Sequence, residues 1–229
     1  MAPENLDVLI VTPNPEEIAP LLDGFRLNRC MTEPLSIGRL DCTLVHPLGM
    51  LVAPGGHGKT QLGVQTQYVI SRFPGLEKVL CVGAAGCLSQ NLAVGDVVVG
   101  TCTVEHDYKP RFNPRPSPRH AVDEMLLQRL RQVSTEKDFR FQVHFGPIAS
   151  GDEDIVDRVR AAELREETGA LCVAWEGSGA ARAAAFNHLR FGELRVITDG
   201  ANPDTPTDYY ANLRRVMPHI AQLIEAAFC

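Results

Sequence analysis

The chain has 229 residues, 45% of them hydrophobic and 22% charged, which is ordinary for a globular protein that buries a large core. Its formal net charge of -6 at pH 7 argues against general nucleic-acid binding, which needs a basic surface. No apolar run approaches the roughly 20 residues needed to span a bilayer, and no secretory signal is visible at the start. We therefore expect a cytoplasmic protein without nucleic-acid or membrane partners.

The seven cysteines are odd in number, include no CxxC pair and fall largely in apolar runs. This usage favours buried, reduced thiols. Neither the cysteines nor the seven histidines have the spacing of metal ligands. We expect neither a metal nor a cofactor.

Strand-like apolar runs alternate with helix-like runs along the chain. The predicted strands cover residues 7–12, 42–46, 51–53, 79–82, 96–104, 143–149, 171–175 and 194–198. The predicted helices cover residues 60–73, 121–133, 156–168, 178–189 and 208–228, the last bent at Pro218. Continuous apolar strands are typical of a sheet with helices on both faces. The pattern predicts one α/β domain over residues 1–229.

One segment interrupts this alternation. Residues 108–120 read YKPRFNPRPSPRH, with four prolines and four positive charges. The prolines exclude both a helix and a central strand, so we expect an ordered surface loop. Such a loop is either functional or merely solvated, and the sequence leaves both interpretations open.

Three segments in the last third each end an apolar run with a polar residue. They read IASGDEDIVD (148–157), CVAWEGSGAARAAAF (172–186) and ELRVITDGAN (193–202). Ligands of open α/β sheets bind at such strand ends, and Glu176 and Asp199 together suggest a pair of carboxylates suited to breaking a glycosidic bond. Taken alone, Glu176 could instead cap the following helix, and Asp199 could form an Asx turn.

Four further stretches carry a resemblance: VLIVTPNPEEIAPLL, APGGHGKTQLG, VGAAGCLSQNLAVGDVVVG and EHDYKP. With the three strand ends, they resemble the purine nucleoside phosphorylase/uridine phosphorylase superfamily, closest to its 5'-methylthioadenosine/S-adenosylhomocysteine nucleosidase branch. The resemblance covers nearly the whole chain. It implies a three-layer α/β/α sandwich with a mixed central sheet and a small-molecule nucleoside substrate.

The resemblance also implies a division of roles. Asp199 would give a proton to N7 of the purine, with a raised pKa and with Thr198 steering it. Glu176 would accept hydrogen bonds from the 2'- and 3'-hydroxyls of the ribose and favour the cationic sugar. Glu17 would activate water, and Arg195 would align an acid near the site.

The loop of small residues Ala84, Ala85 and Gly86 would let the backbone approach the substrate. Ala84 stands where many relatives carry a hydroxyl group, and no arginine flanks the loop. With Glu17 present, these features favour hydrolysis over phosphorolysis.

The expected base pocket departs from the family pattern. Asp154 stands at a position that is aromatic in the nucleosidase branch, beside Ile155, and Trp175 replaces a smaller residue. We expect Ile155 and Asp154 to border the substrate, and stacking on the base to come from Trp175, Tyr209 or Tyr210.

The resemblance implies a homodimer in which a loop of one subunit closes the 5' pocket of its neighbour. Its counterpart is the loop 108–120, with Phe112 as its one large, fully apolar side chain. The basic residues of this loop would favour a substrate with a carboxylate at its 5' end.

These observations predict a hydrolase that splits a 5'-substituted adenosine of the methylthioadenosine or adenosylhomocysteine type into base and sugar. Three alternatives stay open: a phosphate-dependent phosphorylase, a hydrolase of another modified nucleoside such as the futalosine type, and a nucleoside-binding module without turnover.

Overall fold

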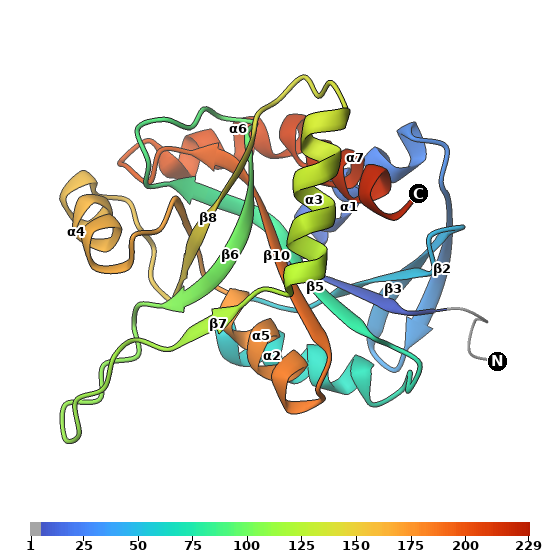
Figure 1. The fold of residues 1–229 in the computed structure, drawn as a ribbon, viewed down its shortest axis with the longest axis horizontal. Coiled ribbons are helices and arrows are strands. Elements are labelled where there is room, and N and C mark those ends of the chain that lie inside the picture. Colours follow the sequence, from blue (N-terminus) through green and yellow to red (C-terminus); the bar gives the residue numbers. More distant parts are fainter. Residues whose placement is uncertain (1–5) are drawn as a thin grey trace.

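A computed structural model describes residues 6–229 and centres on one mixed β-sheet with helices on both sides (Figure 1). The strands are β1 Val8–Thr12, β2 Met31–Ile37, β3 Leu40–His46, β4 Met50–Pro54, β5 Lys78–Cys87, β6 Val97–Glu105, β7 Arg119–Ala121, β8 Val143–Ser150, β9 Cys172–Ala174 and β10 Arg190–Asp199. The helices are α1 Pro15–Leu27, α2 Gly58–Ile70, α3 Glu124–Glu136, α4 Arg158–Thr168, α5 Gly177–Phe186, α6 Thr205–Val216 and α7 Pro218–Phe228. The three-layer α/β arrangement expected from the sequence is confirmed.

The sheet is partly closed rather than fully open. Strand β10 pairs in parallel with β5 and antiparallel with β6, while β8 and β9 complete the circuit from β6 back to β5. From β5 the sheet continues outward through β1 and β4 to the antiparallel edge strands β3 and β2. The carboxyl ends of β1, β5 and β10, which run parallel, therefore meet on one side of the molecule.

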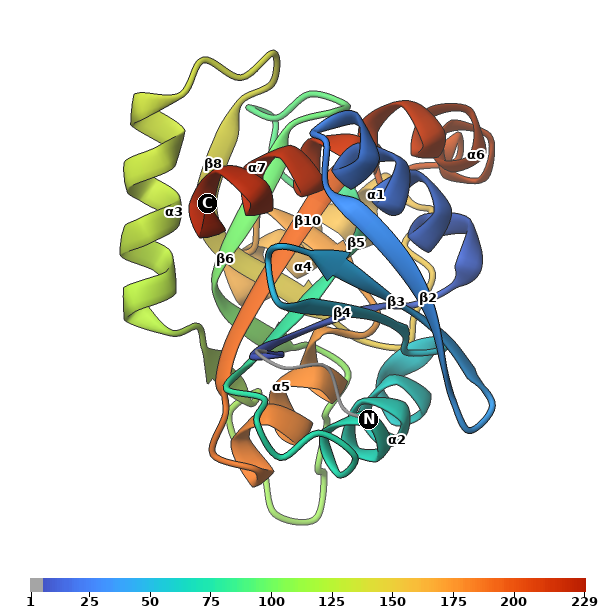
Figure 2. The same cartoon turned by 90° about the vertical axis from the view of Figure 1, so that its right-hand side faces the viewer.

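Burial explains why the central strands are continuously apolar. All five residues of β1 are buried, as are eight of the ten in β5, because helices cover both faces. Helices α2 and α5 pack together on one face, and α1, α3, α6 and α7 lie on the other (Figure 2). Helix α4 stands apart, against β8.

The structure differs from the sequence-based expectation at four elements. Helix α1 lies outside the predicted helix ranges, because Pro20 and Gly24 within it are unfavourable for a helix interior. Strand β2 was not predicted, because it carries Pro34 and mostly exposed side chains, as an edge strand can. Strand β7 was not predicted either, because it is only three residues long and ends the proline-rich loop. The expected bent C-terminal helix is two helices, since Pro218 begins α7 and cannot continue α6.

Within residues 6–229, no helix combines the length and the apolar character needed to cross a membrane. None of the seven cysteines forms a disulfide, and four of them are buried. The proline-rich loop before β7 projects away from the body of the molecule (Figure 1).

Candidate active site

A cavity of about 420 Å³ opens where β1, β5, β9 and β10 end. The sequence turns into α1, α5 and α6 at the same place, so the beginnings of three helices border the cavity. It is lined by Pro13, Asn14, Glu16, Glu17, His57, Ala84, Ala85, Gly86, Glu153, Asp154, Ile155, Val156, Val173, Ala174, Trp175, Glu176, Thr198, Asp199, Thr205, Pro206, Tyr209 and Tyr210. The three carboxylates expected to do the chemistry therefore share one cavity.

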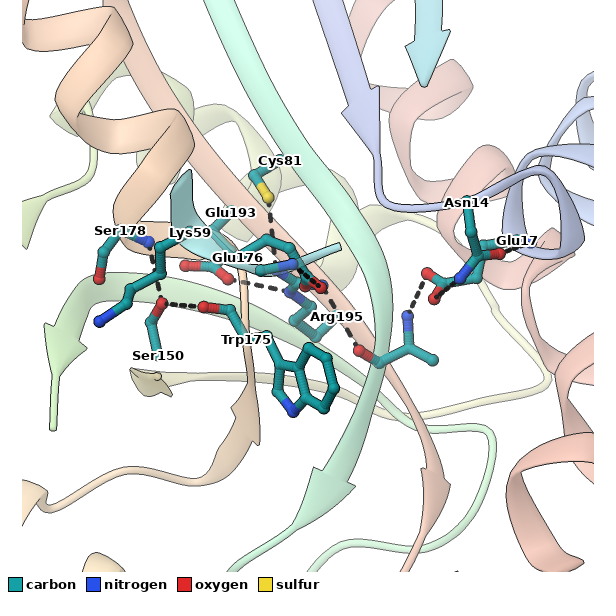
Figure 3. Close-up of polar contacts among 12 residues, drawn as sticks. Asn14, Glu17, Lys59, Cys81, Ser150, Trp175, Glu176, Ser178, Glu193 and Arg195 are labelled. Atoms are coloured by element: carbon teal, nitrogen blue, oxygen red, sulfur yellow. Dashed lines mark hydrogen bonds and ion pairs between the residues drawn. The ribbon is translucent and has the colours of Figure 1, made fainter. Parts of the chain in front are cut away.

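Glu17 is held at the cavity wall by the first turn of α1. Asn14 caps this helix by accepting the Glu17 backbone N–H at 2.9 Å. The Glu17 carboxyl accepts the Ala84 N–H at 2.9 Å and the Asn14 amide at 3.3 Å (Figure 3). It also accepts the Tyr209 hydroxyl at 3.2 Å. Burial, and after it the charge of Glu176, raises the pKa of Glu17 to about 7. A carboxyl with that pKa can take up a proton near neutral pH.

Glu176 lies directly before α5 and is also buried. Its side chain makes no hydrogen bond that caps this helix. Instead, one carboxyl oxygen faces the Gly58 N–H at 3.5 Å and the other faces Arg195 Nη1 at 3.5 Å. Burial raises the pKa of Glu176, opposed by the charge of Arg195. The carboxyl is thus held by contacts outside its own helix, and Glu176 lines the cavity.

Asp199 ends β10 and is fixed by three donors. The Thr198 hydroxyl donates to Oδ2 at 2.8 Å, and the Thr205 hydroxyl and the Ala201 N–H donate to Oδ1 at 2.9 and 3.0 Å. The bond to Ala201 is the Asx-type turn considered above, and it coexists with a place in the cavity wall. The carboxyl therefore has a defined orientation before any ligand binds.

The residues expected around the base also line the cavity. Ile155 is buried, whereas Asp154 is exposed and contributes a carboxylate in place of an aromatic ring. The Trp175 indole meets the His57 ring edge to face, with centroids 6.4 Å apart. The Tyr209 hydroxyl also donates to Glu17, and stacking of its ring on the base stays a prediction.

Phe112 does not line this cavity in its own chain, and its side chain is fully exposed. Of the four basic residues in the loop, Arg119 donates to the Thr168 carbonyl at 3.1 Å and belongs to β7. Lys109, Arg111 and Arg115 are exposed. The contact of Phe112 with a neighbouring subunit stays a prediction.

Several residues that hold the carboxyl groups and Arg195 in place were not predicted from the sequence. Asn14 could have been found as a capping residue before Pro15, a common helix start. Glu193 could have been found too, because a glutamate two residues before an arginine in an apolar strand indicates a buried ion pair. Thr205 carried no signal, since the turn that brings it to Asp199 is set by tertiary structure.

The sequence matches the Phosphorylase superfamily over residues 7–228. A 5'-methylthioadenosine/S-adenosylhomocysteine nucleosidase of Anoxybacillus flavithermus is 26% identical over 228 residues, covering 96% of this chain and 97% of the relative. The enzyme of that name from Thermotoga maritima is 28% identical over 170 residues, covering 72% and 73%.

Solved structures agree with the fold. A mutant of the Helicobacter pylori 5'-methylthioadenosine nucleosidase, with 5'-methylthioadenosine in its active site, superimposes with a TM-score of 0.85 at 24% identity, covering 97% of both chains. Futalosine hydrolase of Helicobacter pylori superimposes with a TM-score of 0.84 at 25% identity, again covering 97% of both chains.

Proposed function

The chain belongs to the phosphorylase superfamily, and we propose that it is a nucleosidase that hydrolyses the N-ribosyl bond of a purine-type nucleoside. The observation that carries this proposal is the meeting of Glu17, Glu176 and Asp199 in one cavity. Breaking an N-ribosyl bond places positive charge on the ribose and negative charge on the departing base. Three carboxyl groups around such a transition state can serve three distinct purposes.

In this mechanism Asp199 gives a proton to N7 of the base, and the hydroxyls of Thr198 and Thr205 hold its carboxyl in place. Glu176 accepts hydrogen bonds from the 2'- and 3'-hydroxyls and stabilises the cationic sugar. Glu17 takes a proton from water as the water attacks C1'. With a pKa of about 7, Glu17 is available as a base near neutral pH.

Two features of the cavity favour water over phosphate as the nucleophile. No lysine or arginine is among the residues that line it within the described chain, and the nearby cation Arg195 is already paired with Glu193 and Glu176, so an anionic nucleophile would meet carboxylates without a free cation in the cavity wall. The Ala84 N–H, one of the backbone donors of the small-residue loop, is already bound to Glu17. A phosphorylase would need such donors for phosphate.

For the substrate, we propose a 5'-substituted adenosine of the methylthioadenosine or adenosylhomocysteine type. The support comes from relatives named for these two compounds, one of which is matched over nearly its full length. A substrate of the futalosine type is the second candidate, because the futalosine hydrolase structure is as similar as the nucleosidases.

We also propose a homodimer in which the projecting loop reaches the partner. Phe112 supports this assembly, because a fully exposed phenylalanine is unfavourable in water and gains from burial in an interface.

The proposal is tested by incubating the protein with a nucleoside panel, with and without phosphate, and measuring the released base by liquid chromatography. The panel comprises methylthioadenosine, adenosylhomocysteine, futalosine, adenosine and inosine. We expect base release without phosphate, abolished in Glu17→Gln and retained in Glu16→Gln, the exposed neighbour on the same helix. Release only with phosphate would identify a phosphorylase. Binding without release of any base would identify a nucleoside-binding module.

A further inference from the structure

Four charged side chains form a buried cluster at the part of the cavity wall that contains Glu17 and Glu176. The cluster consists of Glu17, Glu176, Glu193 and Arg195, and we call it the carboxylate cluster. Glu193 and Arg195 are completely buried, and the other two are 5% exposed. Glu193 and Glu176 pair with the guanidinium of Arg195 (Figure 3). Glu17 lies near the same guanidinium, because a Cβ atom at Gly83 would meet both Glu17 Oε2 and Arg195 Nη1.

The guanidinium of Arg195 is oriented mainly by Glu193. Both residues lie on β10, two positions apart, so their side chains leave the same face of the strand. Arg195 Nε donates to Glu193 Oε1 at 2.9 Å, whereas Nη1 is 3.5 Å from Glu176 Oε2. The remaining contacts of Arg195 are the Cys81 sulfur at 3.3 Å and the Ala84 carbonyl at 3.5 Å.

Glu193 is itself fixed from two other elements. The Thr103 hydroxyl of β6 donates to its second carboxyl oxygen. Gly177, at the start of α5, leaves room for that carboxyl, because a Cβ atom at this position would lie 2.3 Å from Glu193 Oε2. The carboxylate therefore has one position, against the guanidinium.

We propose that Glu193 is a positioning residue that holds Arg195 and neutralises much of its positive charge. The guanidinium then stabilises the ionised carboxyl groups of Glu17 and Glu176 less strongly. The inference rests on the proposed role of Glu17 as the base. A buried site that holds more carboxyl groups than cations retains a proton until a higher pH. Glu193 would thereby set the pH at which the cluster releases its last proton and the base becomes active.

The other titratable groups near the cluster are few. Glu17 faces Tyr209 of α6 as well as Glu176 and Arg195, with Glu16 further out on the same helix. The thiols of Cys81 on β5 and Cys172 on β9 also adjoin it, and burial raises the pKa of both, so they stay neutral. The charge balance near neutral pH is therefore set by the three glutamates and Arg195.

The variant Glu193→Gln tests the inference, because it keeps the shape of the side chain and removes one negative charge. We expect the midpoint of Glu17 ionisation to fall by about one pH unit, the size of effect typical of one nearby like charge. The measurement is a carbon-13 NMR titration of protein labelled at the glutamate carboxyl carbons, with the Glu17 signal assigned by its loss in Glu17→Gln. The acid limb of the kcat/KM profile should move in the same direction by the same amount.

Glu105→Gln is the matched control. Glu105 is a buried glutamate on β6 that pairs with Lys59 and Arg182 and makes no contact with the carboxylate cluster. It should leave the Glu17 midpoint unchanged. If Glu193→Gln does not fold, Glu193→Asp is the second variant. It keeps the charge but moves it away from Arg195 Nε, so we expect the midpoint of Glu17 ionisation to fall by less than in Glu193→Gln.

An unchanged or raised Glu17 midpoint in the folded Glu193 variant would overturn the inference, because a purely structural residue would alter stability alone. The NMR titration does not depend on turnover. Absence of base release in the wild type would thus count against the proposed function, while the titration would still decide the role of Glu193.

Discussion

Replacing Glu17 with glutamine should stabilise the folded protein at alkaline pH while abolishing turnover. The pKa of Glu17 is raised from 4.5 to about 7 by burial. The folded state therefore prefers the protonated carboxyl, and stability that is complete below pH 4.5 is lost as the pH rises through 7. Each unit of pKa shift corresponds to about 1.4 kcal/mol, so the ionised carboxyl costs about 3 kcal/mol at pH 8.

Glutamine cannot ionise and avoids this cost, although it loses hydrogen bonds because its amide has one acceptor oxygen. That loss is the same at every pH, so the pH dependence isolates the charge. Linkage predicts that the stability of Glu17→Gln relative to wild type improves by about 2–3 kcal/mol between pH 5 and pH 8. The relative Tm should rise by about 5–10 °C over that range for a chain of this length.

The assay is urea unfolding followed by circular dichroism at both pH values, for wild type, Glu17→Gln and Glu16→Gln. The last variant removes the same charge from an exposed position and should show no such trend. If the free energy of unfolding of Glu17→Gln did not increase relative to wild type between pH 5 and pH 8, Glu17 would be ionised in the folded state at low pH. The interpretation of Glu17 as a base with a pKa near neutrality would then be wrong.

Three further predictions concern catalysis and assembly. Asp199→Asn should lower base release by about 10²–10⁴-fold, the usual contribution of a positioned acid, and near-wild-type turnover would remove Asp199 from that role. Glu176→Gln should weaken product binding more than Glu17→Gln does, measured by calorimetry, because an amide accepts fewer ribose hydroxyls; equal affinities would argue against a ribose contact. Arg111→Gln with Arg115→Gln should raise KM for adenosylhomocysteine but not for methylthioadenosine, more at low salt, whereas equal effects on both would leave the loop without a role in binding.

Local signals explain why much of the site was predictable. Glu176 and Asp199 each follow an apolar run, and both line the cavity at the ends of these strands. The sequence also predicted the central strands. Each is buried on both faces, so its continuous apolar run can be identified without knowing which strands it pairs with. The single domain over residues 1–229 stays a prediction.

What could not be predicted depends on contacts between distant segments. Strand β2 is an exposed edge whose residues pair only with β3, so its pattern resembles a loop. The hydroxyl of Thr205 reaches Asp199 across a turn that precedes α6, and Glu193 binds Thr103 from another strand. Such pairings are set by packing between distant segments and cannot be predicted from a single sequence.

In the proposed reaction, water held by Glu17 replaces the base at C1' of the sugar. It is tested most directly by mass spectrometry of the sugar formed from methylthioadenosine in the presence of millimolar phosphate. We expect free methylthioribose and a rate independent of phosphate. Formation of methylthioribose 1-phosphate, at a rate that rises with phosphate concentration, would contradict it.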